Sequence, residues 1–201
     1  MATKPSMAEL VETVCDLFEK DGAASNLPDS RPKVFPPASA SQIRAFEKRI
    51  QRRLPPSYVE FLNVTNGIVG YQGAFTLIGV SGEHTEKALT DIEKRRERYV
   101  AAWEKNHGKA TDSAIAAFEK KMDLSKKKED AAGIFPGNKL IVATDFLGSL
   151  FYFLDPGTKK KDSEPELIWR DNQASLVVAQ NFRDMLESDI EVLRDQLGIE
   201  S

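Results

Sequence analysis

The sequence contains few of the side chains that most often carry catalysis or bind metals. Among its 201 residues there are one cysteine, Cys15, and two histidines, His84 and His107. A lone cysteine forms neither an intrachain disulfide nor a cysteine-based metal cage, and the two histidines lie far apart without an HExxH pattern. We therefore expect no metal site and no cofactor, and we assign both histidines a structural or solvent-facing role.

Long apolar runs and a strong charge of one sign are also missing. No run approaches the roughly 18 apolar residues of a membrane span, and Met1 to Leu10 lacks the apolar core of a secretory signal. The 28 basic and 31 acidic side chains leave a formal net charge of -3, which neither steers the chain to a polyanion nor mimics one. These absences predict a cytoplasmic protein that binds neither membranes nor nucleic acids directly.

Familiar catalytic motifs are absent as well. Gly67, Gly70 and Gly73 form a GxxGxxG series, which matches neither a dinucleotide fingerprint nor a phosphate loop and therefore indicates turns. Asp145 and Asp155 would flank a predicted strand, so at about 3.4 Å per residue they stand roughly 20 Å apart. Paired glycosidase carboxylates need a separation of about 5 to 9.5 Å. The sequence thus predicts a protein that is not an enzyme and has no catalytic residues.

An amphipathic helix is predicted after Ser39. Ser39 precedes Gln42 by three positions, the spacing of a capping box. The apolar residues that follow recur at spacings of three and four and so share one helix face. They are Ile43, Phe46, Ile50 and Leu54.

Two prolines end this helix and begin another. Pro55 cannot continue a helix and pushes Leu54 out of helical conformation, whereas Pro56 suits the first turn of a new helix. Asn66 and Gly67 then supply a left-handed stop.

The whole stretch, ASASQIRAFEKRIQRRLPPSYVEFLNVTNG at residues 38–67, closely resembles the N-terminal signature of the SUKH superfamily. That superfamily includes fungal cell-wall regulators and many bacterial immunity proteins. The resemblance implies a strand, a variable segment, a hairpin around an aspartate and a glycine, a further strand and a C-terminal helix. Segments that fill these places are 74–80, 140–144, 145–148, 149–154, 167–169 and 182–193, so the resemblance covers roughly residues 36–195.

The remaining segments complete a predicted division of the chain. Ser6 and Glu9 form a second capping box, ahead of a helix within residues 1–24 that Gly22 can end. Four prolines favour an extended connector over residues 25–38. The SUKH-like domain at 36–195 then contains a charged helical expansion at 84–132.

The predicted fold class is α+β: a single SUKH-like domain with a mostly antiparallel sheet packed by helices. Residues 149–154 are apolar on both faces, so this strand should be central or covered on both sides, by helices or by a second copy of the chain. The pattern leaves the oligomeric state open. The final helix places its acidic residues on the outside: Asp184, Glu187, Asp189 and Glu191.

The resemblance and the missing catalytic motifs together predict an immunity-type protein. It would bind a cognate toxin domain, a nuclease or a nucleic-acid deaminase, and neutralise it directly. Acidic and aromatic groups near the sheet edges would engage a basic toxin cleft. The candidate partner-binding residues are Asp145, Phe146, Trp169 and Asp171.

Two other functional classes remain open at this stage. The fungal branch of the resemblance implies a regulatory scaffold that binds a host signalling protein. An enzyme with an unfamiliar site would need a concave pocket that gathers polar side chains distant in the sequence.

Overall fold

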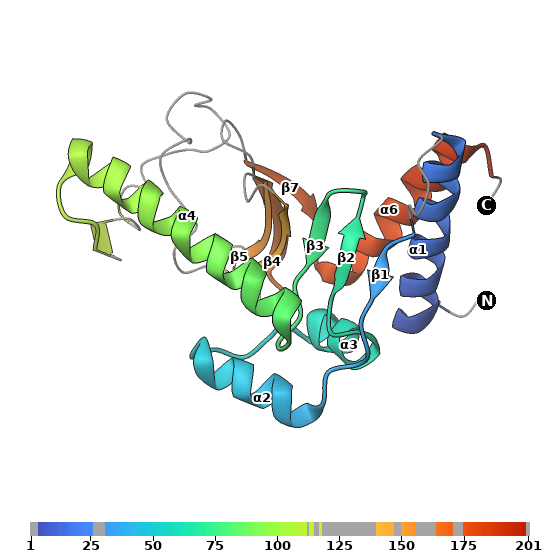
Figure 1. Ribbon diagram of the computed structural model, residues 1–201, viewed down its shortest axis with the longest axis horizontal. Helices are drawn as coiled ribbons and strands as arrows, with labels where there is room; N and C mark the ends of the chain where they lie inside the picture. Colours follow the sequence, from blue (N-terminus) through green and yellow to red (C-terminus); the bar gives the residue numbers. More distant parts are fainter. Residues whose placement is uncertain are drawn as a thin grey trace.

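The computed structural model describes residues 4–25, 31–111, 113–114, 117, 140–146, 150–155, 164–170 and 175–199. Its centre is an antiparallel sheet whose seven described strands follow one another in chain order (Figure 1). The strands are β1 (Lys33–Val34), β2 (Ile68–Tyr71), β3 (Phe75–Leu77), β4 (Leu140–Asp145), β5 (Phe151–Asp155), β6 (Glu166–Arg170) and β7 (Ser175–Ala179). The predicted α+β class with a mostly antiparallel sheet is confirmed.

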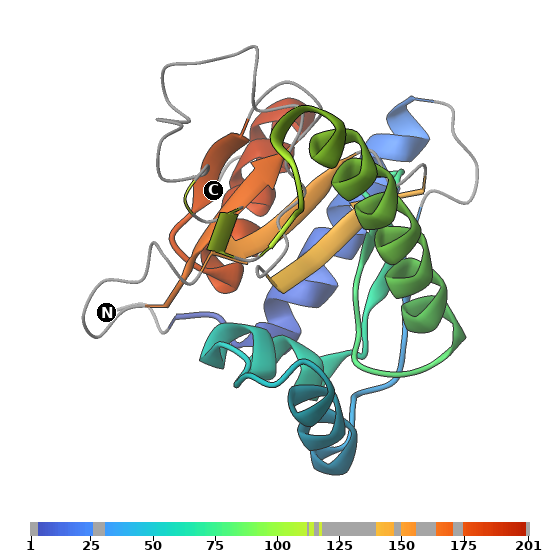
Figure 2. The same cartoon turned by 90° about the vertical axis from the view of Figure 1, so that its left-hand side faces the viewer.

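Helices cover both faces of this sheet. The described helices are α1 (Met7–Ala24), α2 (Ala40–Arg49), α3 (Pro56–Val64), α4 (Glu83–His107) and α6 (Phe182–Leu197). On one face, α1 packs against α6 and α3 over the main hydrophobic core. On the other face, Ala88 and Ile92 of α4 pack against Phe151 and Phe153 of β5. Figure 2 shows α4 crossing in front of the strands with α1 behind them.

Both predicted capping boxes are present. The Ser6 hydroxyl accepts a bond from the backbone amide of Glu9, and the Ser39 hydroxyl accepts one from Gln42. Each partner's side chain reaches back to the amide of its serine, so orphan donors of the first turn are satisfied reciprocally. The first helix does not stop at Gly22, however; it continues to Ala24.

The prediction that α2 extends to Leu54 is wrong in length. The helix ends at Arg49, and Gln51 then adopts a φ of 53°, which breaks the helical path. Leu54 is nevertheless buried, and its backbone amide donates to the Glu47 carboxylate at 2.9 Å. The apolar spacing therefore correctly identified Leu54 as a core residue, although Leu54 lies beyond the end of α2.

The two prolines act as expected, since Pro55 caps α3 and Pro56 is its first residue. Gly67 does not stop this helix, which ends at Val64 with an extended Thr65 as its cap. The φ of 109° at Gly67 instead turns the chain into β2, where an added Cβ would lie 2.8 Å from the Leu77 carbonyl oxygen. Close backbone approach, not helix termination, requires this glycine.

The connector is tied to the body at several points. Its residues Lys33 and Val34 form β1 and pair with β2, which was not predicted. The Phe35 amide donates to the Gly67 carbonyl at 3.2 Å. Arg31 forms ion pairs with α1 carboxylates, among them Glu19 at 2.7 Å. The extended segment thus links α1 to the edge of the sheet.

Strands β3 to β6 lie where the sequence predicted them, whereas β2 and β7 were missed. β5 pairs with β4 and β6, and its side chains enter both hydrophobic clusters, which confirms its predicted coverage on both sides. The charged segment expected to be helical contains α4. Residues 118–139 lie outside the described part of the chain.

Candidate functional site

The residues that the sequence singled out as partner-binding lie at or near one end of the sheet. Strand register defines this end. Tyr71 pairs with Phe75, which pairs with Asp145 on its other side. Phe151 pairs with Thr144, one residue before Asp145, and continues the row through Arg170 to Ser175. We call it the turn end of the sheet, since the turn between β2 and β3 lies there. Asp171 directly follows this row but lies outside the described residues.

Asp145 is buried, with 7% of its surface exposed. Its Oδ1 accepts a bond from the Leu150 amide at 3.0 Å, and its own amide donates to the Leu150 carbonyl at 3.2 Å. These two bonds join the end of β4 to the start of β5. The carboxylate therefore has a turn-forming role, in line with the hairpin around an aspartate that the family resemblance implies.

Phe146 is the residue that this turn presents to solvent. Its side chain is 76% exposed, far more than any other large hydrophobic side chain among the described residues. Its amide donates to the Ala74 carbonyl at 3.1 Å, which fixes the backbone beside the β2–β3 turn. The aromatic ring is therefore accessible to a partner.

Trp169 of β6 is half-buried and pairs in register with Tyr152 of β5. Residues directly opposite in an antiparallel pair share a face, so Trp169 lies on the face covered by α1 and α6. The Tyr152 ring packs edge-on against Phe75 with centroids 5.2 Å apart. Aromatic side chains thus continue across this face toward the β2–β3 turn.

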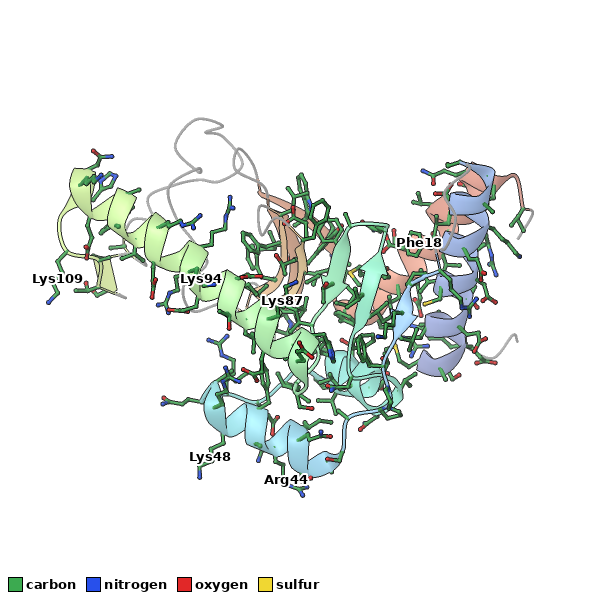
Figure 3. The ribbon with its side chains drawn as sticks, in the orientation of Figure 1. Phe18, Arg44, Lys48, Lys87, Lys94 and Lys109 are labelled. Atoms are coloured by element: carbon green, nitrogen blue, oxygen red, sulfur yellow. The ribbon has the colours of Figure 1, made fainter. Side chains whose placement is uncertain are left out.

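A recess opens where α1, α6 and the β2–β3 turn meet. Its volume is about 340 Å³. Phe18 (marked in Figure 3), Val192 and Leu193 form an apolar wall. Asp21, Gln72 and Asp189 contribute polar groups. We call this feature the acidic recess.

Asp189 is the central polar group of the acidic recess, although the sequence pattern placed it on the outside of the final helix. Its Oδ2 accepts bonds from the hydroxyl of the fully buried Tyr71 and from Gln72 Nε2, the latter at 3.2 Å. Burial raises the pKa of the Asp189 carboxyl, and the bonds from Tyr71 and Gln72 partly oppose that rise. The carboxylate is therefore held in place and partly stripped of water.

Gln72 connects the recess to the sheet. It adopts a φ of 49°, a conformation uncommon for residues other than glycine. Its Nε2 donates to Asp189 while its Oε1 accepts from the Tyr152 hydroxyl at 3.5 Å. The hydrogen-bonded turn from Tyr71 to Ala74 explains this φ, because both of its central residues, Gln72 and Gly73, have positive φ. No short-range sequence pattern identifies the residues of the recess and their hydrogen-bond partners, because they come from α1, β2, β5 and α6.

Charge is divided between two parts of the molecule. The helices beside the recess, α1 and α6, are acidic. Their only basic residues are one lysine in α1 and two arginines in α6. Their acidic residues are Glu9, Glu12, Asp16, Glu19, Asp21, Asp184, Glu187, Asp189, Glu191 and Asp195. Residues 40–53 contain one acid and the bases Arg44, Lys48, Arg49, Arg52 and Arg53. Figure 3 shows Arg44 and Lys48 pointing away from the sheet. The small net charge conceals this separation.

His84 and Cys15 both have structural surroundings. His84 Nε2 lies 2.7 Å from the Asn66 carbonyl oxygen, and its ring stacks on Phe35 with centroids 3.6 Å apart. Burial raises the pKa of the Cys15 thiol to about 11, so it stays protonated and unreactive at neutral pH.

The described residues offer neither a cluster suited to a metal ion nor a helix able to cross a membrane. They contain no group of three or more histidine, cysteine, aspartate or glutamate side chains suited to a metal ion. None of the helices in that part of the chain has the length and apolarity to cross a membrane.

Comparison with known families supports the resemblance seen in the sequence. Residues 37–188 match the SMI1 / KNR4 family (SUKH-1), and the chain belongs to that family. A comparison with curated proteins gives no match.

Proposed function

We propose that this protein is an immunity-type binding protein that neutralises a cognate toxin domain by direct contact and without chemical turnover. Family membership is consistent with this role, and the exposed Phe146 carries the proposal. An aromatic side chain that is 76% exposed on a hydrogen-bonded turn has the properties of an interface anchor. The toxin domain would be a nuclease or a nucleic-acid deaminase, as the resemblance to immunity proteins implies.

The binding surface would be the turn end of the sheet. Phe146 inserts into an apolar pocket of the toxin, while Asp145 holds the turn that presents the ring. Trp169 extends the aromatic surface, and Asp171 follows it in the chain as a polar residue at the rim. The acidic helices beside this end complement a cleft that binds nucleic acid, because such clefts are basic. Occupation of the cleft would exclude its substrate.

Co-expression tests this function. A host that produces the toxin encoded next to this gene should survive only when the protein is also produced. Replacement of an interface anchor typically costs about 2 kcal/mol or more, so Phe146→Ala should weaken the purified complex by about 30-fold. Val34→Ala is the matched control, since Val34 is an exposed apolar residue on the edge strand β1, whereas Phe146 follows the central strand β4.

Two results would contradict the proposal. One is unchanged toxicity with every neighbouring candidate and no complex in solution. The other is equal affinity of Phe146→Ala and the wild-type chain for a toxin that the chain does neutralise. Recovery of a host signalling regulator in place of a toxin would favour the regulatory scaffold.

A further inference from the structure

We propose that the acidic recess receives one arginine or lysine side chain of the partner protein. This inference rests on the proposed function, because it names the chemistry that the same end of the molecule recognises. The recess would add a binding pocket for one basic side chain to a surface that otherwise offers an exposed aromatic ring and acidic helices.

The Asp189 carboxylate in the recess is held in position and has an oxygen available to bind a cation. Tyr71 and Gln72 both bind Oδ2 of Asp189, and Oδ1 has no hydrogen-bond partner among the described residues. Neither Asp21 nor Asp189 forms an ion pair with a basic side chain in that part of the chain. A carboxylate fixed by hydrogen bonds in a partly dry site attracts an incoming guanidinium or ammonium more strongly than one in water.

The walls of the recess suit the rest of such a side chain. Arginine and lysine bury their methylene stems along apolar surface while the charged head meets polar groups. Phe18, Val192 and Leu193 supply that surface. A volume of about 340 Å³ lies at the small end of ligand sites, which begin near about 300 Å³, and favours one side chain over a cofactor.

The position of the recess favours a protein as the source of the cation. Gly73 lines the recess, and the next residue, Ala74, accepts the hydrogen bond from Phe146. A partner that covers Phe146 therefore lies beside the β2–β3 turn, which forms part of the recess wall. A purely structural role, in which Asp189 only anchors Tyr71, accounts for the bonds to Oδ2. It does not account for the second carboxylate, Asp21, in the same recess.

A titration of the full-length protein alone tests the chemistry. Butylguanidinium is the probe, and butylurea is its neutral counterpart of similar shape. Amide NMR shifts should move saturably for Gln72, Gly73 and Val192 with the cation only. Asp189→Asn should weaken this binding at least tenfold while its amide oxygen still accepts from Tyr71. Glu191→Gln removes the same charge from the same helix outside the recess and should leave binding unchanged.

The partner arm uses the same variants against the toxin that the wild-type chain neutralises. Asp189→Asn should weaken the complex at least tenfold, and Glu191→Gln should not. If Asp189→Asn fails to fold, Asp21→Asn takes its place, because no described side chain bonds to the Asp21 carboxylate. For Asp21→Asn we expect a threefold or greater loss.

The outcomes separate the two proposals. If the wild-type chain neutralises a toxin but Asp189→Asn and Asp21→Asn bind it with unchanged affinity, the recess inference is overturned and the proposed function stands. Equal binding of butylguanidinium and butylurea, or an equal loss in Glu191→Gln, also overturns it. If no toxin is neutralised, the proposed function fails, and the cation titration alone decides whether the recess binds a basic group. A saturable, cation-specific response would support the recess inference. The absence of such a response would overturn it.

Discussion

At the scale of single residues, Asn66 explains why the end of the family signature matters to the fold. Its Oδ1 accepts from the Val80 amide at 2.7 Å, and its Nδ2 donates to the Ser81 carbonyl at 2.8 Å. Its own carbonyl lies so close to Gly79 that an added Cβ there would be 2.1 Å away. One side chain therefore holds the loop that leads from β3 into α4.

The first prediction at this scale concerns Asn66→Ala. The change leaves the buried Val80 amide without its acceptor, and each buried unsatisfied group costs about 1–3 kcal/mol. We expect the free energy of unfolding, measured in urea, to fall by about 2–4 kcal/mol. Asn63→Ala is the control, because Asn63 is exposed on α3. A loss no larger than that of the control would contradict the assigned role.

At the scale of secondary-structure elements, α1 is the informative case. It precedes the segment that matches the family, residues 37–188, yet it contributes seven buried apolar side chains to the main core. These are Met7, Leu10, Val11, Val14, Cys15, Leu17 and Phe18. It also packs against α3 and α6, so its removal would uncover the face of the sheet that they share.

Truncation tests the contribution of α1. A chain that begins at Pro32 should lose cooperative thermal unfolding, because each fully buried apolar side chain contributes about 1.5–3 kcal/mol and a domain has only about 5–15 kcal/mol of stability in total. Calorimetry and near-UV circular dichroism are the measurements. A truncated chain that melts cooperatively at the wild-type temperature would show that residues after the connector fold without α1.

The sequence predicted elements whose signals are local. Capping boxes at Ser6 and Ser39 and the Pro55–Pro56 break lie within a few residues, so they were found. β1 was missed because two residues carry no periodicity, and β2 because Gly70 and a register shift interrupt it. The hairpin at Asp145 was expected from the family resemblance. The acidic recess was not, since only tertiary contacts bring Phe18, Gln72 and Asp189 together.

At the scale of the whole molecule, the division of charge decides how a partner approaches. Under the proposed function, a basic toxin would be attracted to the acidic helices α1 and α6 and repelled by the basic end of α2. Long-range attraction acts on the rate of association, whereas close contacts such as the one proposed for Phe146 act on dissociation. The two effects can therefore be separated kinetically.

Ionic strength provides that test. Raising the salt concentration from about 0.05 M to about 0.5 M shortens the Debye length, so the association rate constant with the toxin should fall several-fold. Stopped-flow fluorescence measures this rate. Arg44→Gln with Lys48→Gln should leave the rate equal or faster, because both residues belong to the repelling surface. A salt-independent rate, or a slower one in this double variant, would contradict electrostatic guidance by α1 and α6.

The order of the strands has a consequence for how this protein can vary. β3 and β4 are hydrogen-bonded neighbours, yet everything from Ile78 to Lys139 lies between them in the chain. The entropic cost of closing such an excursion grows only with the logarithm of its length, by about 0.6 kcal/mol for each doubling. The length of the segment inserted between β3 and β4 should therefore have little effect on the stability of the sheet. This position can accommodate insertions that differ between lineages, or a grafted foreign module.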